Sequence, residues 1–213
     1  MEDLTIIKGL YAITPDQKDN DLLTYQVEQA IKGGVKLIQY RAKSIAIEQK
    51  KLQAIAIKDL CDKYSVRLIV NDDAKLASNL DAFGVHLGKQ DENIDNARKI
   101  LGPDKCIGVS CYDSITRAKK LCKKPINYIA FGAFFPTTTK PNAPIAALDL
   151  ISKARKFCNL PIVAIGGITL DNISILLDNN IKAVALISSI FKADNIEITT
   201  REFCNILERG MHE

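Results

Sequence analysis

The sequence has no tryptophan, only two histidines and only seven prolines among its 213 residues. It also has no low-complexity segment and no long block of like charge, and its longest apolar run is too short to span a bilayer. The net charge of +4 is a mild bias, which argues against a nucleic-acid-binding tail. A content of 47% hydrophobic and 25% charged residues is typical of a globular protein.

The six cysteines include no Cys-x-x-Cys pair and no cysteine–histidine spacing typical of a zinc site. The opening Met1-Glu2-Asp3-Leu4 lacks the basic start and the long apolar core of an export signal. We therefore expect a cytoplasmic protein with reduced, mostly buried thiols. Three of them, Cys61, Cys122 and Cys158, fall on the apolar faces of predicted helices.

Short apolar runs alternate with longer amphipathic runs along the whole chain. The predicted strands are Leu10–Thr14, Leu37–Arg41, Arg67–Asn71, Gly84–Leu87, Cys106–Ser110, Tyr128–Phe131, Ile162–Ile165 and Ala183–Ile187. The predicted helices are Leu22–Lys32, Ile47–Tyr64, Asp73–Leu80, Asn93–Leu101, Ser114–Lys123, Ala146–Phe157, Leu170–Asn179 and Ile196–Arg209. Strict alternation predicts an α/β fold, a single (β/α)8 TIM barrel with short loops, in which residues 1–213 form one catalytic domain. The alternative, an open doubly wound sheet, would need a nucleotide fingerprint at the first crossover, where Thr14-Pro15-Asp16 stands instead.

In such a barrel the active site gathers where the strands end. The second strand runs into Gln39, Arg41 and Lys43, which alternate and so point the same way. An amide and two cations suit a polyphosphate, although a solvated rim with salt bridges is an alternative.

Carboxylates follow the next two strands. Asp72 and Asp91 lie near the predicted cations, and one or two carboxylates with phosphate oxygens are what Mg²⁺ prefers. Asp73 stands where a helix N-cap belongs. His86 lies in an apolar strand, so a hydrogen-bonded structural histidine is the favoured interpretation.

Hydroxyl and glycine residues follow the later strands. Ser110 can donate to an anion, and the sequence offers it no evident paired base, so a serine nucleophile is not expected. The loop Thr137–Lys140 brings three hydroxyls and an ammonium, and Gly167 and Ser188 could bind a phosphate through backbone N–H and hydroxyl groups. The sequence therefore predicts two anion sites, one cationic and one largely uncharged.

Together these motifs resemble the thiamine phosphate synthase (thiamine-phosphate pyrophosphorylase) family, from Tyr11 to Ser188. The resemblance implies that pyrimidine diphosphate is bound by Gln39, Arg41, Lys43, Asn71, Ser110 and Lys140. It implies catalytic roles for Arg41, Lys43, Ser110 and Lys140, and Mg²⁺ binding by Asp72 and Asp91. It implies that thiazole phosphate is bound by Thr137, Thr138, Thr139, Gly167, Ile187 and Ser188. Departures from the family pattern are Lys89, Tyr112 and Ala133.

The implied reaction joins 4-amino-2-methyl-5-hydroxymethylpyrimidine diphosphate to 4-methyl-5-(2-phosphooxyethyl)thiazole, giving thiamine phosphate and diphosphate. The expected partners are these two small phosphorylated substrates, with no nucleic acid and no membrane, and the sequence is compatible with a homo-oligomer. Two alternatives use the same fold. A thiazole tautomerase would lack the full diphosphate and Mg²⁺ set, and a non-catalytic phosphate-ligand sensor would release no diphosphate.

Overall fold

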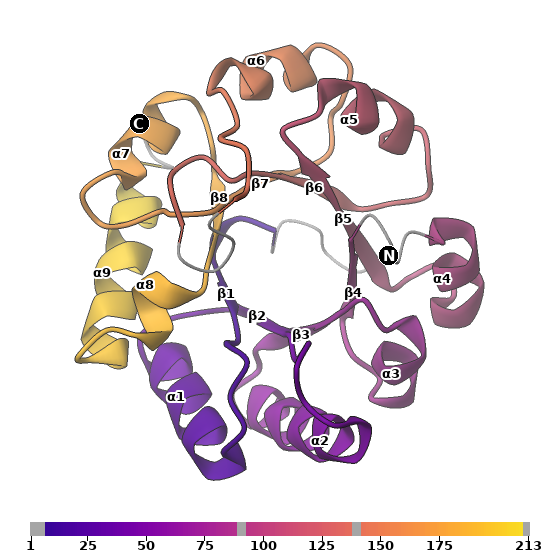
Figure 1. The fold of residues 1–213 in the computed structure, drawn as a ribbon, viewed down its shortest axis with the longest axis vertical. Helices are drawn as coiled ribbons and strands as arrows, with labels where there is room; N and C mark the ends of the chain where they lie inside the picture. Colours follow the sequence, from indigo (N-terminus) through magenta and orange to yellow (C-terminus); the bar gives the residue numbers. More distant parts are fainter. Residues whose placement is uncertain (1–6, 89–92, 138–141, 211–213) are drawn as a thin grey trace.

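The computed structural model describes residues 7–88, 93–137 and 142–210. Eight parallel strands pair in chain order and close into a barrel, as predicted (Figure 1). They are β1 (Gly9–Ile13), β2 (Leu37–Tyr40), β3 (Arg67–Asn71), β4 (Gly84–Leu87), β5 (Cys106–Tyr112), β6 (Tyr128–Phe131), β7 (Ile162–Ile165) and β8 (Ala183–Leu186).

A helix follows each strand and packs outside the barrel, except that β8 is followed by a short helix and then a long one (Figure 1). They are α1 (Asn20–Lys32), α2 (Ile47–Lys63), α3 (Ala74–Asn79), α4 (Ile94–Leu101), α5 (Ile115–Leu121), α6 (Asp149–Arg155), α7 (Ile173–Asp178), α8 (Ser188–Phe191) and α9 (Ile196–Arg209). Within the described residues, no helix has both the length and the apolar character to cross a membrane.

The apolar side chains form two cores, because successive residues of a strand face opposite sides of the sheet. On β1, Leu10 and Ala12 face outward and pack with the helices, whereas Tyr11 and Ile13 face the barrel interior. Burial of both faces explains why the strands read as nearly continuous apolar runs. The interior core contains two polar tips, the hydroxyls of Tyr11 and Tyr128.

Two helices begin three residues later than the sequence predicts. Helix α6 begins at Asp149 rather than Ala146, because the Ala146 N–H donates to the carbonyl of Ala133 and ties this segment to the loop after β6. Helix α7 begins at Ile173 because the Asn172 side chain bonds the backbone of Thr169 and Gly167. In both cases the segment before the helix is non-helical and lies at the end of the barrel where the strands finish.

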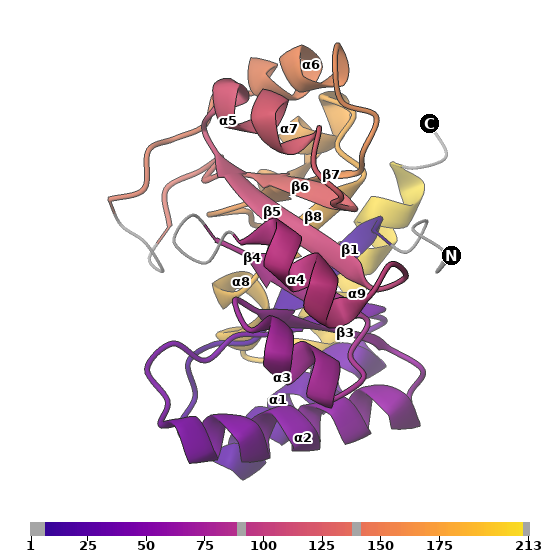
Figure 2. The same cartoon turned by 90° about the vertical axis from the view of Figure 1, so that its right-hand side faces the viewer.

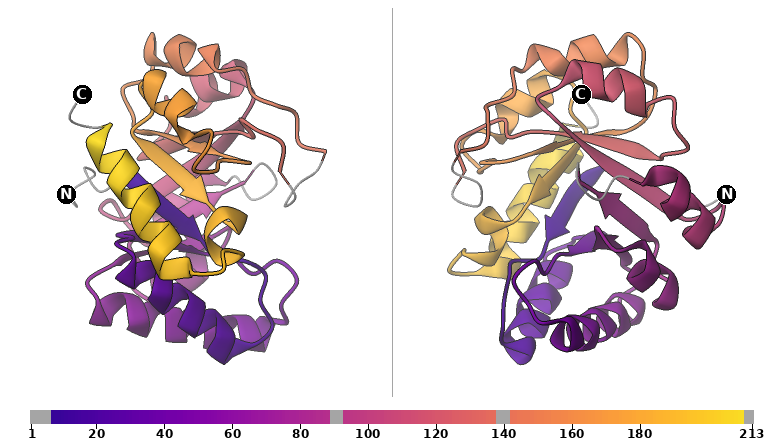
Figure 3. Two further views of the ribbon diagram at one scale, coloured as in Figure 1. Left: turned by 90° about the vertical axis from the view of Figure 1, so that its left-hand side faces the viewer. Right: turned by 45° about the vertical axis from the view of Figure 1, so that its right-hand side comes forward.

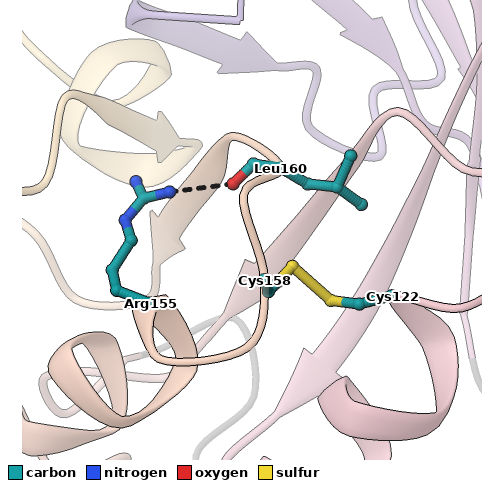
Figure 4. The surroundings of a disulfide bond; sticks show 4 residues. All are labelled: Cys122, Arg155, Cys158 and Leu160. Carbon is teal, nitrogen blue, oxygen red and sulfur yellow. Dashed lines mark hydrogen bonds between the residues drawn. A yellow bond between two sulfur atoms is a disulfide. The ribbon is translucent and has the colours of Figure 1, made fainter.

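The expectation that all cysteines are reduced is wrong for two of them. Cys122, which ends α5, and Cys158, which follows α6, form a disulfide with their Cα atoms 6.0 Å apart (Figure 4). Nearby, Arg155 donates to the carbonyl of Leu160 and closes the turn that carries Cys158 toward β7 (Figure 4). The sequence could not reveal this pairing because the partners are 36 residues apart and join neighbouring helices. Cys61 is buried and unpaired, as expected.

One end of the barrel carries the connections that matter for function. Figures 2 and 3 show α8 at the same end as the loops that leave β1 and β2. This is the end where the strands finish, which is where active sites form in barrels of this kind.

Candidate active site

A cavity of about 330 Å³ lies at this end of the barrel. Eight of the residues predicted from the sequence line it: Gln39, Arg41, Asn71, Ser110, Thr137, Gly167, Ile187 and Ser188. Lys43 and Asp72 lie beside it, joined to its wall through Asn71. The other predicted residues, Asp91, Thr138, Thr139 and Lys140, fall outside the described residues, as does the departure at Lys89.

The cavity wall is uneven in charge. Arg41 is the one arginine or lysine side chain among the described lining residues, and no described aspartate or glutamate lines it. The cation therefore stands on the side of β2, whereas the side formed after β6, β7 and β8 offers hydroxyls and backbone groups. Charged and uncharged groups therefore lie on different sides of one cavity.

Arg41 is fixed at both its backbone and its side chain. The Thr14 hydroxyl accepts from the Arg41 N–H (2.8 Å) and donates to the Arg41 carbonyl (3.2 Å). The Asp16 carboxylate accepts from Arg41 Nη1 (3.0 Å). These bonds hold the β1 and β2 ends together and aim the guanidinium, which is only 16% exposed.

Asp16 also binds the backbone beyond Arg41. Its second oxygen accepts from the N–H groups of Lys43 (2.5 Å) and Ser44 (3.2 Å). Partial burial raises the pKa of Asp16, but the two N–H bonds and the Arg41 charge outweigh it and lower the pKa below its ordinary value of 3.8. The sequence analysis did not identify Thr14 and Asp16 as site residues. Thr14 ends the first predicted strand and Asp16 follows it, and this position is what could have indicated that they belong to the site.

Asp72 is held in an unusual backbone position, with φ at 63°. One of its oxygens accepts from the Gly88 N–H (3.1 Å), and the other accepts from the Asn71 amide (2.5 Å) and lies 3.1 Å from Lys43 Nζ. Non-glycine residues are uncommon in this backbone region, and aspartate is one of those that adopt it more often. The bonds on both oxygens hold the Asp72 carboxylate beside Lys43 and Asn71.

The donor set near Asp72 fits a hard cation. Mg²⁺ takes oxygen ligands and often only one or two carboxylates, with substrate phosphate oxygens and water completing its shell. No cluster of three or more potential metal ligands occurs in residues 7–88, 93–137 and 142–210, so a preformed protein cage is absent from this part of the chain. Asp73 caps α3 by accepting from the Leu76 N–H, as its sequence position predicts.

Ser110 has a hydrogen-bonded histidine neighbour, which the sequence did not reveal. Ser110 Oγ lies 2.9 Å from Nε2 of His86, which is 8% exposed and lines the cavity. His86 comes from β4 and Ser110 from β5, and adjacency of these strands brings them together. As expected, His86 is a hydrogen-bonded histidine inside the barrel: its Nδ1 lies 2.8 Å from the Tyr128 hydroxyl.

The uncharged side of the cavity is built from touching loops. Gly167 has φ at 66°, and a Cβ placed on it would lie 2.5 Å from the Phe135 carbonyl and 2.3 Å from that of Pro136. This glycine therefore lets the loop after β7 pack against the loop after β6. Ser189 Oγ donates to the Ile168 carbonyl (2.5 Å) and joins the loop after β8 to the same assembly.

The chain resembles known proteins over most of its length. A family model described as thiamine monophosphate synthase matches residues 10–190. Thiamine-phosphate synthase of Methylobacillus flagellatus is 48% identical over 92% of this chain and 94% of that protein. The Nitrosomonas eutropha protein of the same name is 41% identical over 94% of each chain.

The fold agrees with the sequence comparison. A solved thiamine phosphate pyrophosphorylase from Pyrococcus furiosus superimposes with a TM-score of 0.87 at 30% identity, covering 98% of both chains. The fold, the site and these likenesses lead to one assignment. The chain belongs to the thiamine monophosphate synthase family and is a transferase that carries out the thiamine-phosphate synthase reaction.

Proposed function

We propose that residues 1–213 act as one catalytic domain that joins pyrimidine diphosphate to thiazole phosphate and releases diphosphate. The observation that carries this proposal is the uneven surroundings of the cavity: on one side Arg41 lines it, with the Lys43–Asp72 pair beside it, and the other side offers hydroxyls and backbone groups. A charged leaving group and a weakly held monophosphate need these two different environments. The names of the relatives, thiamine-phosphate synthase and thiamine phosphate pyrophosphorylase, support the same reaction.

The β2–β3 side is the proposed site of the pyrimidine diphosphate. Arg41, Lys43, Ser110 and Lys140 donate to its phosphate oxygens, and these four groups are the proposed catalytic residues. Gln39 and Asn71 line the cavity beside them, where their amides contact the pyrimidine substrate. Because Thr14 and Asp16 already hold Arg41, little ordering of that side chain is required when substrate binds.

Asp72 and Asp91 are the proposed ligands of a bound Mg²⁺, together with diphosphate oxygens. When bound, the ion would neutralise negative charge that gathers on the leaving group. The protein's own part is to hold Asp72 in place through Gly88 and Asn71, and to keep Lys43 within reach of the same carboxylate.

The β6–β8 side is the proposed site of the thiazole phosphate. Thr137, Ile187, Ser188 and Gly167 line this side of the cavity, and Thr138 and Thr139 extend the same loop in sequence. Hydroxyl and backbone N–H donors bind a monophosphate without competing for the diphosphate. The reaction then proceeds by departure of diphosphate from the pyrimidine methylene and attack by the neutral thiazole nitrogen.

No protein nucleophile is required in this mechanism. The electron-rich aminopyrimidine carries the transient positive charge, and the chain supplies positioning and charge stabilisation. A thiazole tautomerase on this fold gives no reason for a cationic site beside Asp72, whereas a phosphate-ligand sensor would differ from the proposed enzyme in releasing no diphosphate. We also propose that the enzyme works in the cytoplasm on these small substrates without nucleic acid or membrane, and leave a homo-oligomer open.

The test is product analysis with both purified substrates and Mg²⁺. Thiamine phosphate and diphosphate should form in equal amounts, and omission of either substrate should abolish both. Conversion of a thiazole isomer without diphosphate release would instead identify a tautomerase. Binding of both ligands without any turnover would identify a sensor.

A further inference from the structure

Five polar side chains from five strands form a hydrogen-bonded chain across the barrel interior. Gln39 Nε2 donates to the Tyr11 hydroxyl (2.7 Å), which lies 3.0 Å from the Tyr128 hydroxyl. The Tyr128 hydroxyl lies 2.8 Å from His86 Nδ1, and His86 Nε2 lies 2.9 Å from Ser110 Oγ. We call these residues the interior chain. It starts and ends at the cavity, because Gln39 and Ser110 both line it.

The fold makes specific room for this chain. His86, Gly108 and Tyr128 are in register across β4, β5 and β6. A Cβ on Gly108 would lie 1.9 Å from the Tyr128 ring, so the glycine lets that ring cross over β5. The Tyr128 ring stacks on the His86 ring at 5.5 Å between centroids, and it meets the Tyr11 ring edge-on at 6.1 Å.

We infer the direction of the hydrogens along the interior chain from the buried Tyr11 hydroxyl, because the opposite direction would leave its hydrogen without an acceptor among the described residues. Tyr11 accepts from the Gln39 amide, so its own hydrogen goes to Tyr128, its other hydrogen-bond partner among the described residues. Tyr128 then accepts from Tyr11 and gives its hydrogen to His86 Nδ1. With Nδ1 accepting, neutral His86 carries its proton on Nε2 and donates it to Ser110 Oγ.

Both tyrosines keep their hydrogens under ordinary conditions. Burial raises the pKa of Tyr11, and burial followed by the neighbouring Tyr11 raises the pKa of Tyr128. Each hydroxyl is therefore available as a donor, and the order of donors and acceptors described above is complete from Gln39 to Ser110.

We propose that Tyr128 and Tyr11 are positioning residues that hold His86 as the Nε2–H tautomer, so that Ser110 turns its own hydroxyl hydrogen toward the cavity. An anionic oxygen can only accept, so Ser110 must present a hydrogen to bind it. The opposite direction would make Ser110 donate to His86 and show its lone pairs to the anion. The proposal rests on the proposed function in one respect, namely that the anion that Ser110 binds is the diphosphate.

The arrangement differs from a nucleophilic serine–histidine pair. There the histidine Nε2 accepts the serine proton, and a carboxylate accepts a hydrogen bond from the Nδ1–H group. Here a tyrosine hydroxyl donates to Nδ1, which reverses both roles. The pair of Ser110 and His86 is thus set to bind an anion.

The tautomer can be observed directly in the free protein. His86 and His212 are the two histidines of the chain, so the His212→Gln variant leaves one ring to follow. Nitrogen NMR of histidine-labelled protein should show protonated Nε2 and unprotonated Nδ1. Tyr128→Phe should lower the Nε2–H population, and Tyr11→Phe should lower it less, because Tyr128 can still donate. A wild-type ring protonated on Nδ1, or a tautomer unchanged in Tyr128→Phe, overturns the proposal.

Kinetics separate positioning from a loss of folding. Tyr128→Phe should lower kcat/KM by about 3- to 10-fold, the scale of one hydrogen bond. Because its effect acts through Ser110, the double variant Tyr128→Phe/Ser110→Ala should match Ser110→Ala within about twofold. Tyr40→Phe is the matched control, since this buried tyrosine bonds Gln53 and the Lys50 carbonyl outside the interior chain. It should leave the tautomer and kcat/KM unchanged.

The two experiments distinguish this inference from the proposed function. The tautomer is read without substrate, so an enzyme that forms no thiamine phosphate could still carry the Nε2–H ring. In that case the positioning of His86 stands and the substrate assignment fails. If the enzyme is active but the losses from Tyr128→Phe and Ser110→Ala multiply in the double variant, the proposed coupling of Tyr128 to Ser110 is wrong.

Discussion

The Lys43 ammonium lies 3.1 Å from the Asp72 carboxylate, linking the end of β2 to the end of β3. Lys43 is proposed to donate hydrogen bonds to the diphosphate, and Asp72 is proposed to bind the metal ion. Lys43 is half exposed whereas Asp72 is 18% exposed, so the lysine is the partner that can swing away. In the proposed function Asp72 would hold the metal ion, and Lys43 would then be within reach of the phosphate oxygens.

Asp72→Asn should therefore raise the Mg²⁺ concentration needed for half-maximal rate and lower turnover by about 10² or more, because a charged ligand is replaced by a neutral amide. Asp91→Asn should act in the same direction. Initial rates across a Mg²⁺ titration measure both effects.

The neighbouring Asp73→Asn is the matched control for that titration. Asp73 caps α3 and pairs with Lys50, and asparagine is an equally good N-cap. Its Mg²⁺ response should equal that of the wild type. If Asp72→Asn and Asp91→Asn also follow the wild-type curve at limiting Mg²⁺, the metal assignment is wrong.

Lys140→Ala should lower kcat/KM by about 10² or more, the scale for losing one electrostatic donor to a transition state. We expect the loss to fall on the diphosphate step. Steady-state kinetics with each substrate varied in turn would show it. A change limited to the KM for thiazole phosphate would move this lysine to the other half of the site.

Asp16→Asn should lower the free energy of unfolding at pH 7 by about 1 kcal/mol, the scale of a partly exposed ion pair. The pKa of Asp16 is depressed in the folded state, so its contribution is present above the ordinary value of 3.8 and is lost as the pH falls through the lower folded value. Urea unfolding at several pH values should show wild type and variant converging in acid. A constant difference at every pH would mean that Asp16 acts without its charge.

Cys122→Ser should lower the free energy of unfolding by up to about 4 kcal/mol, the loop-closure scale for partners 36 residues apart. Reductant should destabilise the wild type by a similar amount and leave Cys122→Ser unchanged. Cys204→Ser, at a cysteine outside the disulfide, should keep the response to reductant. A wild type insensitive to reductant under complete reduction would show that the disulfide adds no stability.

The barrel could be predicted from the sequence because each of its strands and helices is recognisable from a short stretch of neighbouring residues. Apolar runs such as Leu37–Tyr40 read as strands on their own, and alternation places Gln39 and Arg41 on one side of β2. Eight cavity-lining residues were predicted for the same reason, since each lies near the end of a recognisable strand or in the loop after it.

The contacts that fix these residues could not be predicted because they join distant positions. Asp16 and Arg41 form a hydrogen bond although they are 25 residues apart in the sequence, and Tyr11 and Tyr128 do so although they are 117 residues apart. Tyr128 also needs the gap at Gly108, which only the register of β5 and β6 reveals. Sequence periodicity carries no information on such pairings.

Gly167 illustrates a similar limit. Its sequence position suggested close approach of a phosphate, but the Phe135 and Pro136 carbonyls occupy the space that a side chain would need. A bulky substitution would displace the loop after β6, so it cannot isolate thiazole phosphate binding. Ser188 is the better probe of that half of the site.

Calorimetry with the two substrates tested separately examines the division of the site most directly. Arg41→Ala should lose most of the affinity for pyrimidine diphosphate in Mg²⁺ and keep that for thiazole phosphate within about twofold. Ser188→Ala should show the reverse, weakening thiazole phosphate by about 10-fold, the scale of a hydrogen bond to a charged group. Equal losses of both ligands in either variant would contradict the division into a cationic diphosphate half and an uncharged phosphate half.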